Sequence, residues 1–230
     1  MYKNIELINL QTHKNSAVKA IEKFHYAQNL MSTSITAPEF FQSCKDYPIV
    51  FIKDNNNWVA TVMLGYEENK NIYVNVTGQW EIGKYLPASI RRYPFVFVAQ
   101  AENQLSLGID SSALSTADED KERRFFTDED KPSEYTEGVL KFMNQFQADA
   151  MATSNFIEQL EKWELLEEGK AQVVTQENKS YQIDGFFIVN EEKLQHLSKK
   201  KKQEICDENA YPLITAHLIS LSNIQRMGLK

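Results

Sequence analysis

Glycine is scarce in this sequence, and the glycine-based motifs of common enzyme classes are absent from it. Only 8 glycines occur among 230 residues, about half of the roughly 7% that is usual in soluble proteins. No GxGxxG, GxxxxGK(S/T) or GxSxG pattern is present. The sequence therefore carries no signature of a dinucleotide site, a phosphate-binding loop or an esterase nucleophile, and we expect no cofactor.

Cysteine and histidine are also few, and neither shows the spacing of a metal site. The two cysteines, Cys44 and Cys206, lie far apart and belong to no CxxC pair, and the four histidines form no HExxH or HxH pattern. Isolated cysteines of this kind are typical of free thiols in a reducing compartment. We therefore predict a cytoplasmic protein, and the sequence indicates no metal ligands.

Long hydrophobic runs are missing as well. The longest strongly apolar stretches span about six residues, as at residues 94–99, whereas a membrane-spanning helix needs about 20. The first residues of the chain turn polar again by Asn9, so no targeting segment is expected. These absences argue against an integral membrane protein.

Positive charge is in deficit, since 32 acidic residues against 25 basic ones give a net charge of −7. This surplus of acid repels phosphate backbones, so we expect no nucleic-acid partner. Apolar material, in contrast, is plentiful: 42% of the residues are hydrophobic, and 13 are phenylalanine. Disordered chains lack such content, so the composition predicts a globular fold with a sizeable core.

Short apolar or alternating segments in the first half predict β-strands. They are residues 48–52, 58–64, 71–76, 95–99 and 105–109. A turn-forming cluster at residues 54–57 joins the first two segments into a hairpin, and Glu102-Asn103 joins the last two. Strands connected by such tight turns are typical of an antiparallel sheet.

The second half changes to helical spacing. Apolar residues at intervals of three and four predict a long helix over residues 139–166, with start signals at 130–133 and Gly169 as its stop. A further hairpin is expected within residues 173–189, followed by closing helices at 191–197, 200–207 and 211–227. This segregation favours an α+β fold, with a largely antiparallel sheet in the N-terminal half, a long helix, a further hairpin and closing helices.

The densest group of chemistry-bearing side chains lies within residues 80–95. The adjacent Arg91 and Arg92 occur there among the aromatic residues Trp80, Tyr85 and Tyr93. Guanidinium groups bind carboxylate or phosphate oxygens in pairs and stack on aromatic rings. The segment is therefore a candidate clamp for an anion.

Glu39 and Asp46 are candidate acids near this group. If they were buried side by side, their pKa values would be pushed apart, as general acid–base catalysis requires. The structural alternative is that they cap helices or that one of them pairs with Arg91 or Arg92, the other arginine then facing water.

Two histidines are candidates for a catalytic acid or base. They are His13 and His217, the latter on the last predicted helix. The alternative is a hydrogen-bonded core histidine. Phe142 and Phe146, four residues apart on the long helix, are expected to belong to the core, and the lysine run at residues 199–202 is expected to form a solvated helix face.

Several segments together resemble the SapC family of bacterial proteins. They are residues 4–9 with His13, 37–40, 46–51, 64–66, Trp80, 85–88 leading into 91–95, 126–128, 153–160, 185–189 and 216–221. The most specific of them is Tyr85-Leu86-Pro87-Ala88 before the double arginine. One departure is Lys131, which stands before Pro132 where the family often has glycine. Because the likeness covers nearly the whole chain, it implies a single SapC-like domain over residues 1–230.

No catalytic mechanism comes with this resemblance. The family takes its name from an association with bacterial surface-layer systems, which implies a non-catalytic accessory or binding protein linked to surface-layer or envelope processes, with a protein partner. The alternative is a small enzyme or ligand-binding domain that holds an anionic metabolite, amino acid or peptide through Arg91 and Arg92. The sequence carries no mark of an oligomeric state.

Overall fold

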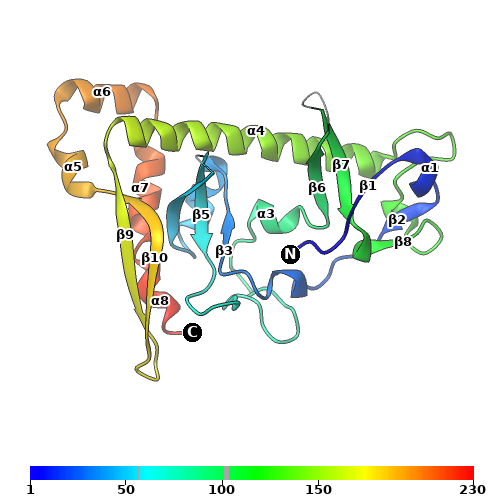
Figure 1. The fold of residues 1–230 in the computed structure, drawn as a ribbon, viewed down its shortest axis with the longest axis horizontal. Helices are drawn as coiled ribbons and strands as arrows, with labels where there is room; N and C mark the ends of the chain where they lie inside the picture. The colour runs from blue at the N-terminus through cyan, green and yellow to red at the C-terminus, as the bar shows by residue number, and fades with distance from the viewer. Residues whose placement is uncertain (56, 101–103) are drawn as a thin grey trace.

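The computed structural model describes residues 1–55, 57–100 and 104–230. It has the α+β fold that the sequence predicts, with a long helix, α4 (Glu134–Lys162), extending across two antiparallel sheets (Figure 1). Short helical segments connect the strands of the first half. They are α1 (Leu10–His13), η1 (His25–Ala27), η2 (Ala37–Glu39), α2 (Phe40–Ser43), α3 (Ala88–Arg91), η4 (Ser111–Ala113) and η5 (Lys121–Arg123).

The larger sheet has five strands, in the order β3 (Ser32–Ser34), β5 (Asn57–Met63), β4 (Ile49–Asp54), β10 (Ser180–Val189) and β9 (Leu166–Val174). β4 and β5 confirm the first predicted hairpin, and β9 and β10 confirm the one predicted within residues 173–189. Each hairpin has an asparagine with positive φ in its turn, Asn55 at 46° and Asn178 at 59°. Asparagine tolerates this left-handed conformation better than most residues do, which is why these turns could be recognised.

The smaller sheet has three strands, in the order β1 (Ile5–Leu7), β7 (Leu105–Asp110) and β6 (Phe95–Ala99). β6 and β7 confirm the hairpin predicted within residues 95–109, while its predicted turn at Glu102-Asn103 lies outside the described residues. A separate two-stranded pair joins β2 (Ser16–Val18) to β8 (Leu114–Thr116). The three-residue strands β1, β2 and β3 are too short to show a period in the sequence.

α4 is the element that joins the two sheets. It begins as predicted, after Ser133, whose side chain accepts a backbone N–H of the first turn. At 1.5 Å per residue, its 29 residues span about 43 Å. The first half of α4 packs Met143 against Phe125 in the core of the smaller sheet. The second half packs Ile157 and Leu160 into the core of the larger sheet.

The strand predicted at residues 71–76 is wrong. This segment is a loop in which Val74 makes an isolated bridge to Trp80. Asn71 and Asn75 explain the difference, because their side chains bond the backbone in place of a neighbouring strand. The Asn71 side-chain oxygen accepts the Tyr73 N–H at 2.9 Å, and the Asn75 oxygen accepts two backbone N–H groups of the following turn.

The predicted helix stop at Gly169 is also wrong. α4 ends earlier, at its C-cap Trp163, and Glu164 then takes the left-handed conformation with φ of 62°. Gly169 lies inside β9, where an added Cβ would stand 2.1 Å from a ring carbon of Phe186. This glycine therefore makes room for an aromatic ring on the neighbouring strand and does not end a helix.

The closing helices are α5 (Glu191–His196), α6 (Lys199–Asp207), α7 (Tyr211–Ser220) and α8 (Asn223–Met227). The first two confirm their predictions, and the lysine run lies on α6. The single helix predicted at residues 211–227 is in fact two, because the backbone hydrogen bonds of Leu221 and Ser222 tighten to the residue three positions back. Within the described ranges, no helix has the length and apolar character needed to cross a membrane.

Candidate anion-binding cleft

An open cleft of about 370 Å³ lies where α3 and the start of β6 face the first turns of α4. Figure 1 shows α3 between the two sheets and beneath α4. The walls are formed by side chains from the α3–β6 segment on one side and from α4 on the other: Arg91, Arg92, Tyr93 and Phe95, and Glu134, Tyr135, Gly138, Val139 and Phe142. The arginine pair singled out in the sequence thus lines a concave surface.

Aromatic rings of α4 orient both guanidinium groups. The guanidinium carbon of Arg91 lies 5.7 Å from the centroid of the Phe142 ring, and that of Arg92 lies 5.0 Å from the centroid of the Phe146 ring. Both distances are within the range of cation–π attraction. Since a ring does not neutralise the charge, each arginine keeps its attraction for an anion. Arg91 is also positioned by its Nε, which donates to the Leu86 carbonyl oxygen at 3.2 Å.

Neither arginine forms an ion pair within the described part of the chain, where every ion pair joins other residues. The Nε donor of Arg92 is buried and has no hydrogen-bond acceptor among the described residues. Buried donors are nearly always paired, so this unpaired guanidinium N–H is an exception to the usual pattern. Beside it, burial raises the pKa of the Tyr2 phenol, and the charge of Arg92 opposes that rise.

The α4 wall follows one ridge of the helix, formed by Glu134, Gly138 and Phe142 at four-residue spacing. Gly138 stands in the middle of this ridge, and an added Cβ there would have no atom within 4 Å. A glycine inside a helix costs about 0.5–1 kcal/mol relative to alanine, and close packing does not account for it at this position. Its missing side chain leaves the floor of the cleft open.

The aromatic side of the cleft is held in place by stacking. Tyr93 stacks on Tyr26 with ring centroids 3.9 Å apart and 15° between the ring planes. Its hydroxyl oxygen lies 3.3 Å from the Ser112 hydroxyl oxygen. Burial raises the pKa of Tyr26, which stacks on Tyr93, and of Tyr135, which lines the cleft, so both phenols are neutral near pH 7.

Glu39 and Tyr85 support Arg91 from behind. The Glu39 carboxylate accepts hydrogen bonds from the N–H and hydroxyl of Thr36, from the Tyr85 hydroxyl and from the Ala88 N–H, at 2.7–3.0 Å. Arg91 in turn donates to the Tyr85 hydroxyl oxygen at 3.4 Å. Burial, with a contribution from the Glu39 carboxylate, raises the pKa of Tyr85 to about 12. Glu39 thus caps η2 and anchors the start of α3, which is the structural alternative considered for it.

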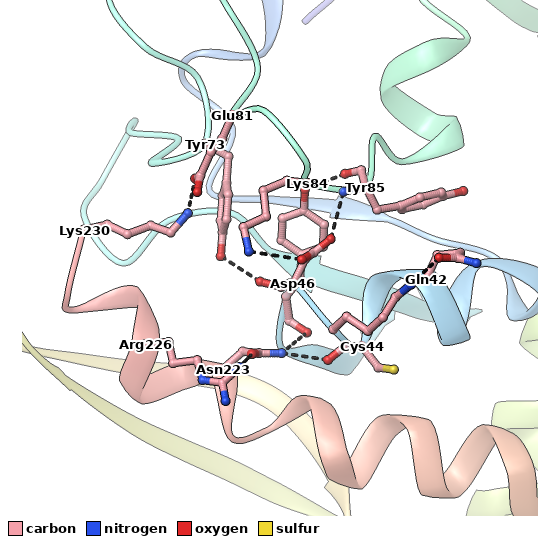
Figure 2. Close-up of polar contacts among 12 residues, drawn as sticks. Gln42, Cys44, Asp46, Tyr73, Glu81, Lys84, Tyr85, Asn223, Arg226 and Lys230 are labelled. Atoms are coloured by element: carbon pink, nitrogen blue, oxygen red, sulfur yellow. Dashed lines mark hydrogen bonds and ion pairs between the residues drawn. The ribbon is translucent and has the colours of Figure 1, made fainter.

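Asp46 belongs to a neighbouring network, which shares Tyr85 with that of Glu39 and is drawn in Figure 2. Its carboxylate accepts hydrogen bonds from Lys84 Nζ at 3.1 Å and from the Tyr85 N–H at 2.9 Å. Its backbone oxygen accepts the Tyr73 hydroxyl at 3.1 Å. Lys84 is therefore the cation that pairs with Asp46, and the arginine–acid pairing considered from the sequence is not present in the described chain.

Trp80 and His13 lie outside the cleft lining. Trp80 is buried and donates from Nε1 to the Tyr47 hydroxyl oxygen at 3.1 Å. His13 is buried against Phe125, with ring centroids 6.1 Å apart. Both residues pack within cores, so the structure brings neither of them to the arginines.

His217 joins two strands of the larger sheet. Its Nε2 accepts the Val189 N–H at 3.0 Å, and its Nδ1 lies 2.9 Å from the Ile49 carbonyl oxygen, to which it donates. Burial lowers the pKa of His217 to about 4, so the ring is neutral near pH 7. The imidazole therefore bridges β10 and β4 as a hydrogen-bonded core histidine.

The cleft supplies groups that can bind an anion. None of the side chains considered as a catalytic acid or base lies beside the two arginines with a free proton-transfer group. Glu39, Asp46 and His217 are engaged in hydrogen bonds elsewhere. In the part of the chain that the structure describes, no group of three His, Cys, Asp or Glu side chains is arranged to hold a metal ion. Cys44 and Cys206 are free thiols.

The sequence model of the SapC family matches residues 8–227 of the 230-residue chain. The chain belongs to the SapC family. No curated protein and no solved structure matches it. The segment that resembles SapC most specifically, residues 85–95, is also the one that supplies Arg91 and Arg92 to the cleft.

In this SapC-family chain, sequence patterns miss the α4 half of the cleft. No pattern in the sequence singles out Glu134, and Phe142, expected in the core, is half-buried beneath Arg91. Phe146 is buried as expected, at 8% exposure. The available signal is a glycine in the middle of a helical ridge where alanine is the better helix former.

Proposed function

We propose that this protein is a non-catalytic binding protein whose cleft between α3 and α4 holds carboxylate groups of an acidic protein partner. The observation that carries the proposal is the pair Arg91 and Arg92, which lines one cleft and forms no ion pair among the described residues. Two adjacent guanidinium forks suit carboxylates because each can form two parallel hydrogen bonds.

The walls of the cleft support a protein partner. Tyr93, Tyr135 and Phe142 are half-buried and leave ring surface beside the arginines. Aromatic residues and arginine are the types that dominate the binding energy of protein interfaces. A protein segment with acidic side chains therefore fits both the charge and the apolar surface of the cleft.

The alternative of a small enzyme for an anionic metabolite requires a general acid or base beside the arginines. Glu39 and Asp46 are bonded to other groups, and His13 and His217 are packed in cores, which favours binding over catalysis. Membership of the SapC family supports an accessory role in surface-layer or envelope processes, and the two free thiols support a cytoplasmic location.

Fluorescence polarisation with a fluorescein-labelled peptide of five aspartates tests this proposal. Arg91→Gln with Arg92→Gln should weaken binding at least about tenfold, since two charge-assisted contacts are lost. The matched control is Lys199→Gln with Lys200→Gln, which removes the same charge from exposed positions of α6. Equal weakening by both double variants, or no weakening by the arginine variant, would show that the cleft is not the binding site.

A further inference from the structure

A second cleft, of about 200 Å³, lies farther along α4. Its main apolar walls are Ile35, Trp58 and Val59 on the side of the larger sheet and Phe146 and Ala150 on α4. It is thus formed where the second half of α4 meets the edge of the five-stranded sheet.

Both clefts lie on one ridge of α4. Phe142, Phe146 and Ala150 follow each other at four-residue spacing, a row that winds slowly around a helix. Arg91 faces the first of these residues and Arg92 the second, and Phe146 is also a wall of the second cleft. Arg92 therefore faces a residue that also lines the apolar cleft, and Arg91 faces the residue one turn of α4 before it.

Three polar side chains in the wall of the second cleft already have hydrogen-bond partners. Trp58 donates from Nε1 to Glu161 at 2.9 Å, and the Thr36 hydroxyl donates to Glu39 at 2.9 Å. The Thr153 hydroxyl is engaged with two backbone groups. No unpaired donor of these three residues is left to attract a charged group, so the cleft suits an apolar side chain, in contrast to the one that holds the arginines.

We propose that the second cleft receives an apolar side chain of the same acidic partner, whose carboxylates bind Arg91 and Arg92. The inference rests on the proposed function. Eight residues separate Phe142 from Ala150, a rise of about 12 Å along α4. An extended peptide advances about 3.3 Å per residue, so an aliphatic or methionine side chain three or four residues from the carboxylate that binds Arg91 reaches the second cleft.

A leucine walk tests the spacing. Fluorescein-labelled nonapeptides carry two adjacent aspartates in a Gly-Ser background, with one leucine moved through every other position on either side of the pair. Leucine three or four residues from the aspartates, on one side, should tighten binding about tenfold over the peptide without leucine, as burial of one aliphatic side chain allows. Equal affinity at every leucine position would overturn the inference.

Filling the second cleft gives an independent measurement. Ala150→Leu should abolish the leucine preference and leave the weaker binding of the leucine-free peptide unchanged, while Ala148→Leu, at an exposed position of the same helix, should alter neither. A leucine preference that survives in Ala150→Leu, or that is lost equally in Ala148→Leu, would overturn the inference alone. If the double variant Arg91→Gln with Arg92→Gln binds every peptide as tightly as the wild type does, the proposed function would instead be overturned.

Discussion

His217 and Arg92 each have a buried nitrogen donor, but they differ in whether this donor has a hydrogen-bond partner. Both ring nitrogens of His217 have backbone partners, at 2.9 and 3.0 Å. The Nε of Arg92 has none among the described residues. A buried polar group with all its partners stabilises the fold, whereas one that lacks a partner adds no such hydrogen bond.

The position of His217 in the sheet shows why the fold needs it. β4 and β10 lie side by side in the larger sheet, but the register between them includes a single residue pair, Phe51 with Phe187. The imidazole of His217 bridges Ile49 of β4 to Val189 of β10 and so extends the connection between the strands. The Arg92 guanidinium bridges no two strands in this way among the described residues, so the comparison predicts that the two residues respond differently to substitution.

Replacement of His217 should have the largest effect. His217→Leu leaves the Ile49 carbonyl and the Val189 N–H buried without a partner, at a cost of about 1–3 kcal/mol each. We expect a loss of about 4 kcal/mol in the free energy of unfolding, measured by urea denaturation. His13→Leu is the matched control, because His13 is also buried but makes one long hydrogen bond, from the Asn9 N–H to its Nδ1 at 3.4 Å, and its Nε2 has no hydrogen-bond partner among the described residues. A similar loss in both variants would contradict the role assigned to His217.

The pH dependence of stability should follow from the same histidine. Its pKa is about 4 in the folded protein against 6.5 in the unfolded chain, so the unfolded state takes up the proton first as the pH falls. The stability that depends on a neutral His217 is fully present above pH 6.5 and is lost as the pH falls toward 4. The free energy of unfolding should fall by about 3 kcal/mol in total for this reason. His217→Gln, whose amide can donate and accept but does not titrate, should flatten the slope in that window. If the free energy of unfolding of His217→Gln changes with pH as it does in the wild type, other titratable groups must cause the pH dependence.

A smaller loss is expected at Glu39. Glu39→Gln replaces one acceptor oxygen by an NH2 group in a site with four donors, so we expect a loss of about 2 kcal/mol in the free energy of unfolding. Glu134→Gln also replaces a carboxylate by an amide, but at an exposed position of the cleft. It should leave the free energy of unfolding within about 0.5 kcal/mol of the wild-type value. Thermal unfolding of the two variants in parallel measures the difference. Equal stability would mean that the Glu39 network is not needed for the fold.

How far the sequence predicts this fold depends on whether a feature is local. The hairpins with Asn55 and Asn178 in their turns could be predicted because their signals lie within a few residues. Gly169 could not be interpreted correctly, since its reason is the ring of Phe186 on another strand. The loop at residues 71–76 failed for a related reason, because Asn71 also donates to the distant Ala27 carbonyl at 3.0 Å.

The candidate site divides in the same way. Arg91 and Arg92 could be singled out because the arginines and their aromatic neighbours are contiguous in the sequence. Their lack of an acidic partner could not be predicted, since Asp46 is instead paired with Lys84 through tertiary contacts. Which face of α4 opposes α3 is likewise set by packing, so Gly138 became recognisable only in the structure.

The smallest predicted change in stability tests the cleft most directly. Gly138→Ala should raise the free energy of unfolding by about 0.5–1 kcal/mol, because alanine is the better helix former and its Cβ meets no atom within 4 Å. The same methyl group enters the cleft beside Arg91 and should weaken binding of the aspartate peptide about threefold or more.

Ala148→Gly provides the reverse control, since it should destabilise α4 by about as much as Gly138→Ala stabilises it, with no effect on binding. A more stable protein that binds less well is an outcome that a purely structural glycine does not produce. If Gly138→Ala gains stability and keeps full affinity, the floor of the cleft is not in contact with the ligand, and the arginines alone would have to account for binding.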